Sequence, residues 1–390
     1  MRDFRFLWGG RAVSLLGSWL LVVAVPAHMY ALTGSVFATG ATLAAECLPV
    51  LVLGPVAGVL VDRWDRRRVM IAADLFRAIA VAAMVAGTPA AIYVAVVGES
   101  VGAVVFRPAA QAHVPATVGA ENLSAANSWN AATDGVVRLA GPPLGGALLA
   151  WAGFEVVIAL DVVSYLLSAA AIARTARRFV PSTGRARLTA VKNIRLVRVL
   201  LPLTGVFLAA NAALSALLVP FGVRDLGGSA QVGMVLSALG AGFLGGAVIV
   251  RWLGRIQLRT VLAVAQLATA AGFALLFSAN ELITAMIAAV LIGVFGSVTV
   301  VAPQTALQRT VDNGQLGRIS AIFLMVEAAA TLVGAIAGPW LAESVSLHFA
   351  AMTAAAITAA AALAGAVTVP RVMLATKRSN EQAETRARTR

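Results

Sequence analysis

The chain has 390 residues, of which 60% are hydrophobic and 12% are charged. Soluble domains carry about 25% charged residues, so this composition excludes an ordinary soluble protein and indicates a chain that crosses a membrane many times. The formal net charge of +13 does not indicate a nucleic-acid partner, because basic residues that flank membrane spans orient such a protein.

Apolar runs recur along the chain, each long enough to cross the hydrocarbon core, which takes about 20 helical residues. The first run begins near Phe6 and is too long for a cleavable signal peptide, so we read it as the first span. The predicted spans are 6–31, 36–61, 69–88, 90–107, 124–150, 155–174, 198–221, 230–250, 258–278, 281–302, 318–341 and 346–369. The predicted fold class is therefore an all-α membrane protein with twelve transmembrane helices.

Twelve spans place both termini on one side of the membrane, and the cations follow that side. Of the 30 lysines and arginines, 26 fall on the terminus side, Arg107 among them. Arg224 lies in a loop on the other side, and Arg11, Arg77 and Arg138 lie within spans. The positive-inside rule then places both termini in the cytoplasm. The preference for arginine over lysine is typical of a GC-rich bacterial genome, so we expect the bacterial inner membrane.

The chain divides at its longest internal loop, which is basic and rich in turn residues. The predicted division is an N-terminal six-helix bundle at 1–174, a cytoplasmic linker at 175–197, a C-terminal six-helix bundle at 198–369 and a disordered cytoplasmic tail at 370–390. The halves repeat weakly: a shift of 188 residues places Gly54 and Gly58 on Gly242 and Gly246. A duplicated transporter with two pseudo-symmetric halves predicts such a repeat.

A short basic segment, residues 54–68, separates the second and third spans. An arginine or aspartate at the bilayer centre costs about 2.5–3.5 kcal/mol, so this turn must lie at the water edge. It resembles the G-x-x-x-D-R-x-x-R-R loop between helices 2 and 3 of the major facilitator superfamily, except that Asp65 stands where glycine is common. The resemblance implies a cytoplasmic gate, a charge cluster at the inner face that helps to hold the outward-open state, to which we also assign Arg77. The gate residues are Gly54, Gly58, Asp62, Arg63, Arg66, Arg67 and Asp74.

The fifth span contains a run of glycine and proline, residues 138–146. A proline inside a helix removes a backbone donor and kinks the helix, and the glycines of the run permit close packing. A bent, tightly packed helix is therefore a purely structural explanation of this run. The run also resembles the G-P-x-x-G-G antiporter motif of the superfamily, which implies export. The matching residues are Gly141, Pro142, Gly145 and Gly146.

Four other stretches narrow the resemblance to the branch that holds macrolide-efflux and enterobactin-exporter-type proteins. They are 4–8, 106–112, 161–168 and 307–311. This resemblance covers nearly the whole chain and implies the superfamily fold and transport of a small molecule. It does not select the substrate.

Carboxylates in the middle of spans are the sharpest functional signal, because an ionisable group in hydrocarbon is costly unless it is paired or hydrated. Removal from water favours the neutral form of a carboxyl group, so such groups are candidates for proton coupling or substrate binding. The candidates are Glu46, Glu99, Asp134, Arg138 and Glu327. Asp134 and Arg138 are four residues apart and suited to an ion pair, whose structural alternative is a static contact. The arginine usual in helix 4 of the superfamily is missing before Arg107, and we expect a structural role for Asp161.

Several other function classes lack their motifs. The chain has no Gly-Lys-Ser/Thr phosphate loop and no His-Glu-x-x-His motif, and His28, His113 and His348 are not at metal-ligand spacing. We therefore expect no enzyme activity, no cofactor and no metal site. The prediction is a monomeric secondary active transporter that exports a small lipophilic compound, such as a drug, macrolide or siderophore, in exchange for protons. A non-transporting sensor or receptor on the same scaffold and an importer are the alternatives.

Overall fold

The computed structural model describes residues 2–118, 123–175, 195–250, 252–253, 256–310 and 313–371. The elements formed in these ranges are all helices, which confirms the predicted all-α class. They are α1 (Arg2–Thr33), α2 (Val36–Arg63), α3 (Arg66–Ala82), η1 (Ala83–Ala86), α4 (Pro89–Val118), α5 (Leu123–Ala152), α6 (Phe154–Ala173), α7 (Arg195–Asp225), α8 (Ser229–Ile249), α9 (Leu258–Leu276), α10 (Leu282–Thr310), α11 (Asn313–Ser344) and α12 (Leu347–Thr368).

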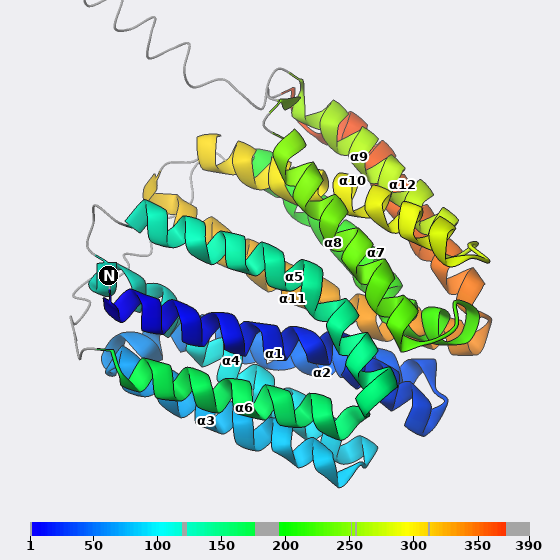
Figure 1. Ribbon diagram of the computed structural model, residues 1–390. Helices are drawn as coiled ribbons and strands as arrows, with labels where there is room; N and C mark the ends of the chain where they lie inside the picture. Colours follow the sequence, from blue (N-terminus) through cyan, green and yellow to red (C-terminus); the bar gives the residue numbers. More distant parts are fainter. Residues whose placement is uncertain are drawn as a thin grey trace, which may run out of the picture.

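Eleven of these helices are long and apolar enough to cross a membrane. The remaining long helix, α5, has 30 residues and lies among the others with a similar length (Figure 1). It carries the polar residues Asp134 and Arg138 and the helix-bending residues Pro142 and Pro143.

Several helices continue beyond the apolar runs that predicted them. The fourth span was expected to end at Arg107, yet α4 continues to Val118, and α10 continues past its predicted end to Thr310. Hydropathy marks where the lipid ends, whereas helical hydrogen bonds continue into water. Arg107, predicted at the end of the fourth span, therefore lies inside α4, within a candidate membrane span that ends at Gln111. Its place on the cytoplasmic side stays a prediction.

The first six helices pack mainly on one another, and so do the last six (Figure 1). Between the two groups, the main contacts are those of α5 with α8 and of α2 with α11. Most of the interval predicted to link the groups, 175–197, lies outside the described residues, as does the predicted tail beyond 371. We call α1–α6 the N-half and α7–α12 the C-half.

Glycines let the two halves touch at one end of the molecule. A Cβ atom at Gly146 of α5 would overlap the carbonyl oxygen of Ser229, at the start of α8. A Cβ atom at Gly40 of α2 would overlap Pro339 and lie 2.6 Å from the carbonyl oxygen of Ala335 on α11. Small residues allow this approach of one helix backbone to another in membrane proteins. We call this end the closed side.

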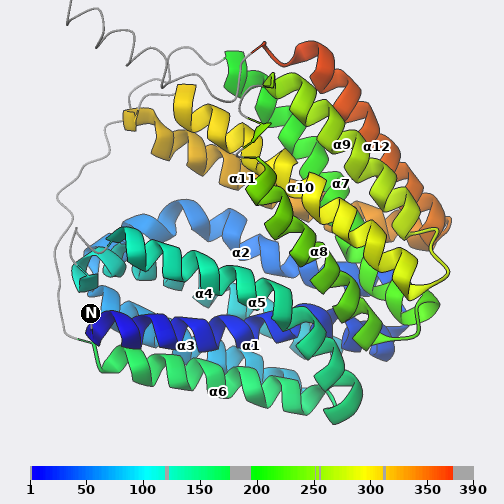
Figure 2. The ribbon, with the colours of Figure 1, turned by 45° about the horizontal axis from the view of Figure 1, so that its top comes forward.

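The halves separate towards the opposite end, where α1 begins (Figure 2). Gly54, near the end of α2, has no neighbouring atom within 4 Å of the position of a Cβ. We call this end the open side. The contacts between the halves are thus concentrated away from the N-terminus.

The closed side gives a test of the packing. Replacement of Gly146 by alanine should destabilise the protein by about 1–3 kcal/mol, because the added methyl group must displace backbone atoms of α8. The matched control is Gly296→Ala on α10, where no atom lies within 4 Å of the new Cβ and helix propensity favours alanine by up to about 1 kcal/mol. The measurement is thermal unfolding of the purified protein in detergent. Equal unfolding temperatures for the two variants would contradict the contact.

Candidate functional site

In the basic turn between α2 and α3, Asp65 caps the N-terminus of α3. The side chain of Asp65 accepts hydrogen bonds from the backbone N–H groups of Arg67, at 3.0 Å, and Arg68, at 3.4 Å. Aspartate is favoured at this position because it satisfies donors that have no partner within the helix. The departure from glycine at Asp65 therefore has a local structural reason.

Arg67 connects this turn to the end of α6. Its Nε donates to the carbonyl oxygen of Ile172 at 3.2 Å, and its Nη2 donates to that of Ala173. An arginine at a helix C-terminus satisfies free carbonyl groups and favours the helix dipole. The surroundings of Gly58 and the side chains of Asp62 and Arg63 lie outside what the structure describes, so the gate role remains a prediction.

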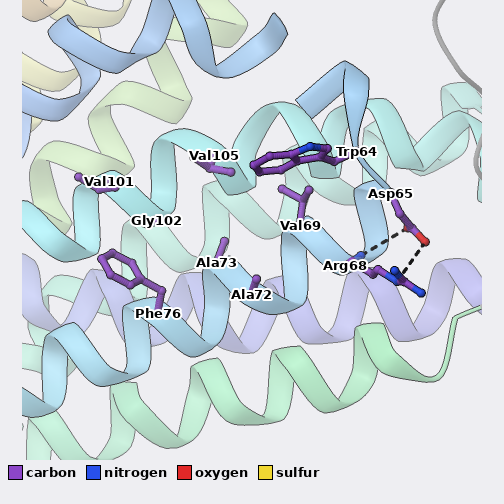
Figure 3. A pocket seen from close by; sticks show the side chains of 10 residues that line it. All are labelled: Trp64, Asp65, Arg68, Val69, Ala72, Ala73, Phe76, Val101, Gly102 and Val105. Atoms are coloured by element: carbon purple, nitrogen blue, oxygen red, sulfur yellow. Dashed lines mark hydrogen bonds and ion pairs between the residues drawn. The ribbon is translucent and has the colours of Figure 1, made fainter. Parts of the chain in front are cut away.

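A pocket of about 790 Å³ lies beside the turn, between α3 and α4 (Figure 3). Trp64, Asp65 and Arg68 stand at one end, and the other lining residues, such as Phe76 and Val105, are apolar. None of the candidate carboxylates lines this pocket. It is therefore separate from the groups that are candidates for proton coupling.

Two candidate carboxylates come from opposite halves. Glu46 on α2 and Glu327 on α11 have accessible side chains, and both interact electrostatically with Cys47 and with Arg107. Glu46 also interacts electrostatically with Glu99 of α4. Its exposed side chain therefore has charged neighbours within the N-half.

Two arginines accompany these carboxylates. Arg107 of α4 interacts with both glutamates, so α4 does carry a cation near the candidate site, which the expected helix end had hidden. Arg138 of α5 lies over the rings of Trp19 in the N-half, at 5.2 Å, and Phe243 in the C-half, at 5.7 Å. It also interacts electrostatically with Glu327. We call Glu46, Arg107, Arg138 and Glu327 the central group.

Asp134 does not form the expected pair with Arg138. Both of its carboxylate oxygens accept from Nη2 of Arg11, at 2.8 and 3.0 Å, and Nη1 of Arg11 donates to Asn130 at 3.1 Å. A guanidinium from the neighbouring helix α1 thus takes the place of the one four residues away. This contact is half-exposed and fits the structural alternative of a static ion pair.

Glu99 and Asp74 belong to a different, buried cluster. Asp74 and Arg77 on α3 form an ion pair, and both side chains are buried. Nη1 of Arg77 lies 3.8 Å from Oε1 of Glu99 on α4. The hydroxyl of Tyr165 on α6 donates to the same glutamate oxygen at 2.8 Å. Asp74 and Arg77 are thus buried between helices of the N-half, and their place in the inner-face charge cluster stays a prediction.

The antiporter-like motif forms the face of α5 that packs against α1. A Cβ atom at Gly141 would lie 2.5 Å from Cβ of Trp19, and one at Gly145 would overlap the carbonyl oxygen of Leu20. Pro142 is inside the helix. These contacts give the motif a packing role at the junction of α1, α5 and α8.

The closed side also carries a polar contact between the halves that the sequence did not indicate. Oε1 of Glu343, at the end of α11, accepts from Ser35 Oγ at 2.5 Å and from the backbone N–H of Phe37 at 2.9 Å. These donors lie at the start of α2, where a carboxylate satisfies free N–H groups and favours the helix dipole. A carboxylate of the C-half thus caps a helix of the N-half.

Within the described residues, no group of three or more His, Cys, Asp or Glu side chains is arranged to hold a metal ion. His113 is buried, and neither ring nitrogen has a hydrogen-bond partner. His28 stacks on Phe154 at 3.9 Å between ring centroids. The stacking contact accounts for His28, whereas His113 is buried without a described polar contact.

Comparison with known sequences gives relatives among membrane transporters. The chain matches, over residues 1–387, a family described as transmembrane secretion effector. Macrolide efflux protein A of Streptococcus pyogenes is 29% identical over 176 residues, which is 44% of each chain. The putative bacilysin exporter BacE of Bacillus amyloliquefaciens is 28% identical over 185 residues, 45% of each chain. The matches therefore span less than half the length of these curated relatives.

Solved structures of low identity share the fold. A bacterial homologue of the iron transporter ferroportin, in an inward-facing state, has a TM-score of 0.73 at 17% identity, over 94% of this chain and 99% of its own. The peptide transporter POT in complex with alafosfalin has a TM-score of 0.79 at 13% identity, over 96% of each chain. At these identities the likeness shows the fold alone, and it is the fold predicted from the sequence.

The cap formed by Glu343 gives a second test. Loss of a helix cap costs about 1 kcal/mol, so Glu343→Ala should raise the population in which the closed side has parted by about fivefold. The measurement is the labelling rate, by a membrane-impermeant maleimide, of a cysteine placed at the buried Ala335 in a Cys47→Ala background. Glu155→Ala, an exposed acid at the start of α6, is the control and should leave the rate unchanged. An unchanged rate in Glu343→Ala would show that the cap does not hold this side together.

Proposed function

Because the chain belongs to the transmembrane secretion effector family of the major facilitator superfamily, we propose that it exports a small lipophilic compound from the bacterial cytoplasm in exchange for protons. The proteins it resembles are transporters and not enzymes. The protein would then lie in the bacterial inner membrane, with its termini and its open side in the cytoplasm, as the distribution of cations predicts.

The central group is the observation that carries this proposal. It supplies one accessible carboxylate from each half, Glu46 and Glu327, with Arg107 interacting with both. A carboxylate in a low-dielectric space binds a proton more readily than one in water. Such a group can release its proton to the cytoplasm when the cargo binds in one state and take up a proton from the exterior in the other. Carboxylates from both halves would sense the separation of the halves directly.

Alternating access follows from how the halves meet. They touch through α5 with α8 and α2 with α11, and in this proposal the open side gives the central group access to the cytoplasm. Rocking about these helices would part the closed side and bring the open side together, as in other transporters built from two repeats. The basic turn, with Asp62 and Arg63, then acts as the cytoplasmic gate when the open side closes.

The nature of the cargo rests on the relatives and on the surrounding side chains. Relatives are named for macrolide efflux and for bacilysin export. The helices that face one another are rich in alanine, valine and leucine, with few polar side chains such as Asn130 and Asn211. We therefore propose a lipophilic compound, with a macrolide as the first candidate.

Uptake into inverted membrane vesicles tests the function. A radiolabelled macrolide, and then a panel of lipophilic antibiotics, should accumulate when the vesicle interior is acidic and should stop accumulating when a proton ionophore collapses the gradient. Accumulation that persists without the gradient would refute proton coupling, and the absence of any flux across the panel would favour a sensor. Movement of the compound only out of the inverted vesicles, which corresponds to entry into the cell, would identify an importer.

Two variants assign the coupling to the central group. Glu46→Gln and Glu327→Gln should each reduce gradient-driven uptake by at least about tenfold, a barrier change of roughly 1.4 kcal/mol, while exchange of labelled for unlabelled compound continues. Glu281→Gln, at an exposed loop position before α10, is the control and should transport normally. Normal gradient-driven uptake in both central variants would remove these glutamates from the coupling mechanism.

A further inference from the structure

The buried cluster in the N-half contains more carboxylates than cations. Asp74, Glu99 and Asp161 surround one guanidinium, that of Arg77, and the two aspartates have no exposed surface. If all were ionised, the cluster would have a net charge of −2. Buried charges that lack a partner become neutral instead, because desolvation penalises the ionised form. The count of charges thus requires bound protons.

The contacts distinguish the three acids. Asp74 has a direct ion pair with Arg77, whereas Glu99 lies farther from the same guanidinium, at 3.8 Å, and accepts from Tyr165. Asp161 has no ion pair among the described contacts and accepts only from Ser164 Oγ, at 3.1 Å. Its other oxygen, Oδ2, is buried and has no hydrogen-bond partner. Asp161 is therefore the acid that the site stabilises least as an anion.

Other oxygen atoms of the cluster are also incompletely paired. Oδ2 of Asp74 and Oγ of Ser168 are also buried without a hydrogen-bond partner of normal geometry, although they lie close enough to interact. On the other side, α1 crosses the cluster at Gly17, where a Cβ would overlap Oδ1 of Asp161. The cluster is thus enclosed by helices, and its acids have no second cation among them.

We propose that this cluster is a proton-binding site inside the N-half, separate from the central group, in which Asp161 holds a resident proton and Glu99 is the group that exchanges its proton. With Asp161 neutral, the site has a net charge of −1 when Glu99 is ionised and zero when Glu99 is protonated. Asp74 stays ionised because it holds the direct pair with Arg77. Tyr165 stays neutral and orients the carboxylate of Glu99.

Glu99 connects the site to the central group. Its side chain has 18% of its surface exposed, whereas Asp74 and Asp161 have none. It interacts electrostatically with Glu46, and the hydroxyl of its neighbour Ser100 donates to the backbone oxygen of Glu46 at 2.5 Å. A proton that reaches Glu46 from the open side is therefore beside the exchangeable acid of the buried site.

Every helix around the site contributes known neighbours. Helix α1 presents Ser18, whose Oγ lies 2.9 Å from the Tyr165 hydroxyl, α2 presents Glu46, and α3 presents Asp74 and Arg77. Helix α4 presents Glu99. Helix α6 presents Asp161 and Tyr165 together with the hydroxyls of Ser164 and Ser168. The two rings that face Arg77 are those of Tyr165, at 4.3 Å, and Phe106, at 4.6 Å. Arg77 is the cation of this set, so changes of charge at the site come from the acids.

Infrared spectroscopy tests this site without a substrate. The full-length protein in lipid nanodiscs should show two carbonyl stretching bands of protonated carboxylic acids in a buried environment. One should persist from acid to mildly alkaline buffer, and the other should appear only on acidification. Asp161→Asn should abolish the first, and Glu99→Gln should abolish the second. Glu281→Gln, at an exposed loop position, should leave both unchanged.

The proton-binding site depends on the proposed function only for the use of the exchanged proton. The outcomes of the experiment therefore test the site and the transport function separately. The absence of a persistent band in the wild-type protein, or its survival in Asp161→Asn, would overturn the inference. If Asp161→Asn does not fold, the wild-type band and the Glu99→Gln spectrum still decide the question. A chain that shows both bands and moves no compound supports the site and defeats the transport proposal.

Discussion

The cost of an uncompensated charge in hydrocarbon determines where the ionisable side chains of this protein lie. Three arrangements meet that cost. Arg11 and Asp134 form a half-exposed pair between α1 and α5, and Arg77 is buried with Asp74 beneath two aromatic rings. The central group takes the third course, with the exposed side chains of Glu46 and Glu327 near Arg107. Each arrangement follows from the rule that an intramembrane ion must be paired, neutralised or hydrated.

The same constraint links packing to transport. Close approach of backbones at Gly40 and Gly146 closes one side without any charge, whereas the carboxylate of Glu343 joins the halves at the edge of that side. Besides these two seams, the halves share an apolar cluster of Val23 and Ala27 with Val219 and Val232. The carboxylates of the central group lie between the seams and the open side. Protonation there changes the charge of the space that opens and closes.

The fold was predictable because hydropathy reports lipid directly, and the twelve apolar runs each gave a helix. Interaction partners were less accessible. Spacing on one helix favoured Arg138 as the partner of Asp134, whereas Arg11 from α1 takes that place. The hydropathy drop at Arg107 was taken for a helix end, which hid the cation of α4. Asp74 follows the basic turn in sequence, and the sequence did not show that its side chain is buried in an ion pair with Arg77. These errors arise because a linear pattern records neighbours on one helix and not those on the next.

Rocking of the halves about α2–α11 and α5–α8 is the central claim, and distances between spin labels test it most directly. Labels at the exposed Leu32 and Val345, in a Cys47→Ala background, report across the closed side. In lipid, the account predicts a short distance as in this structure and a second, longer distance whose population changes when the pH is lowered or a transported compound is added. One short distance under every condition would contradict the account, because the closed side would never open.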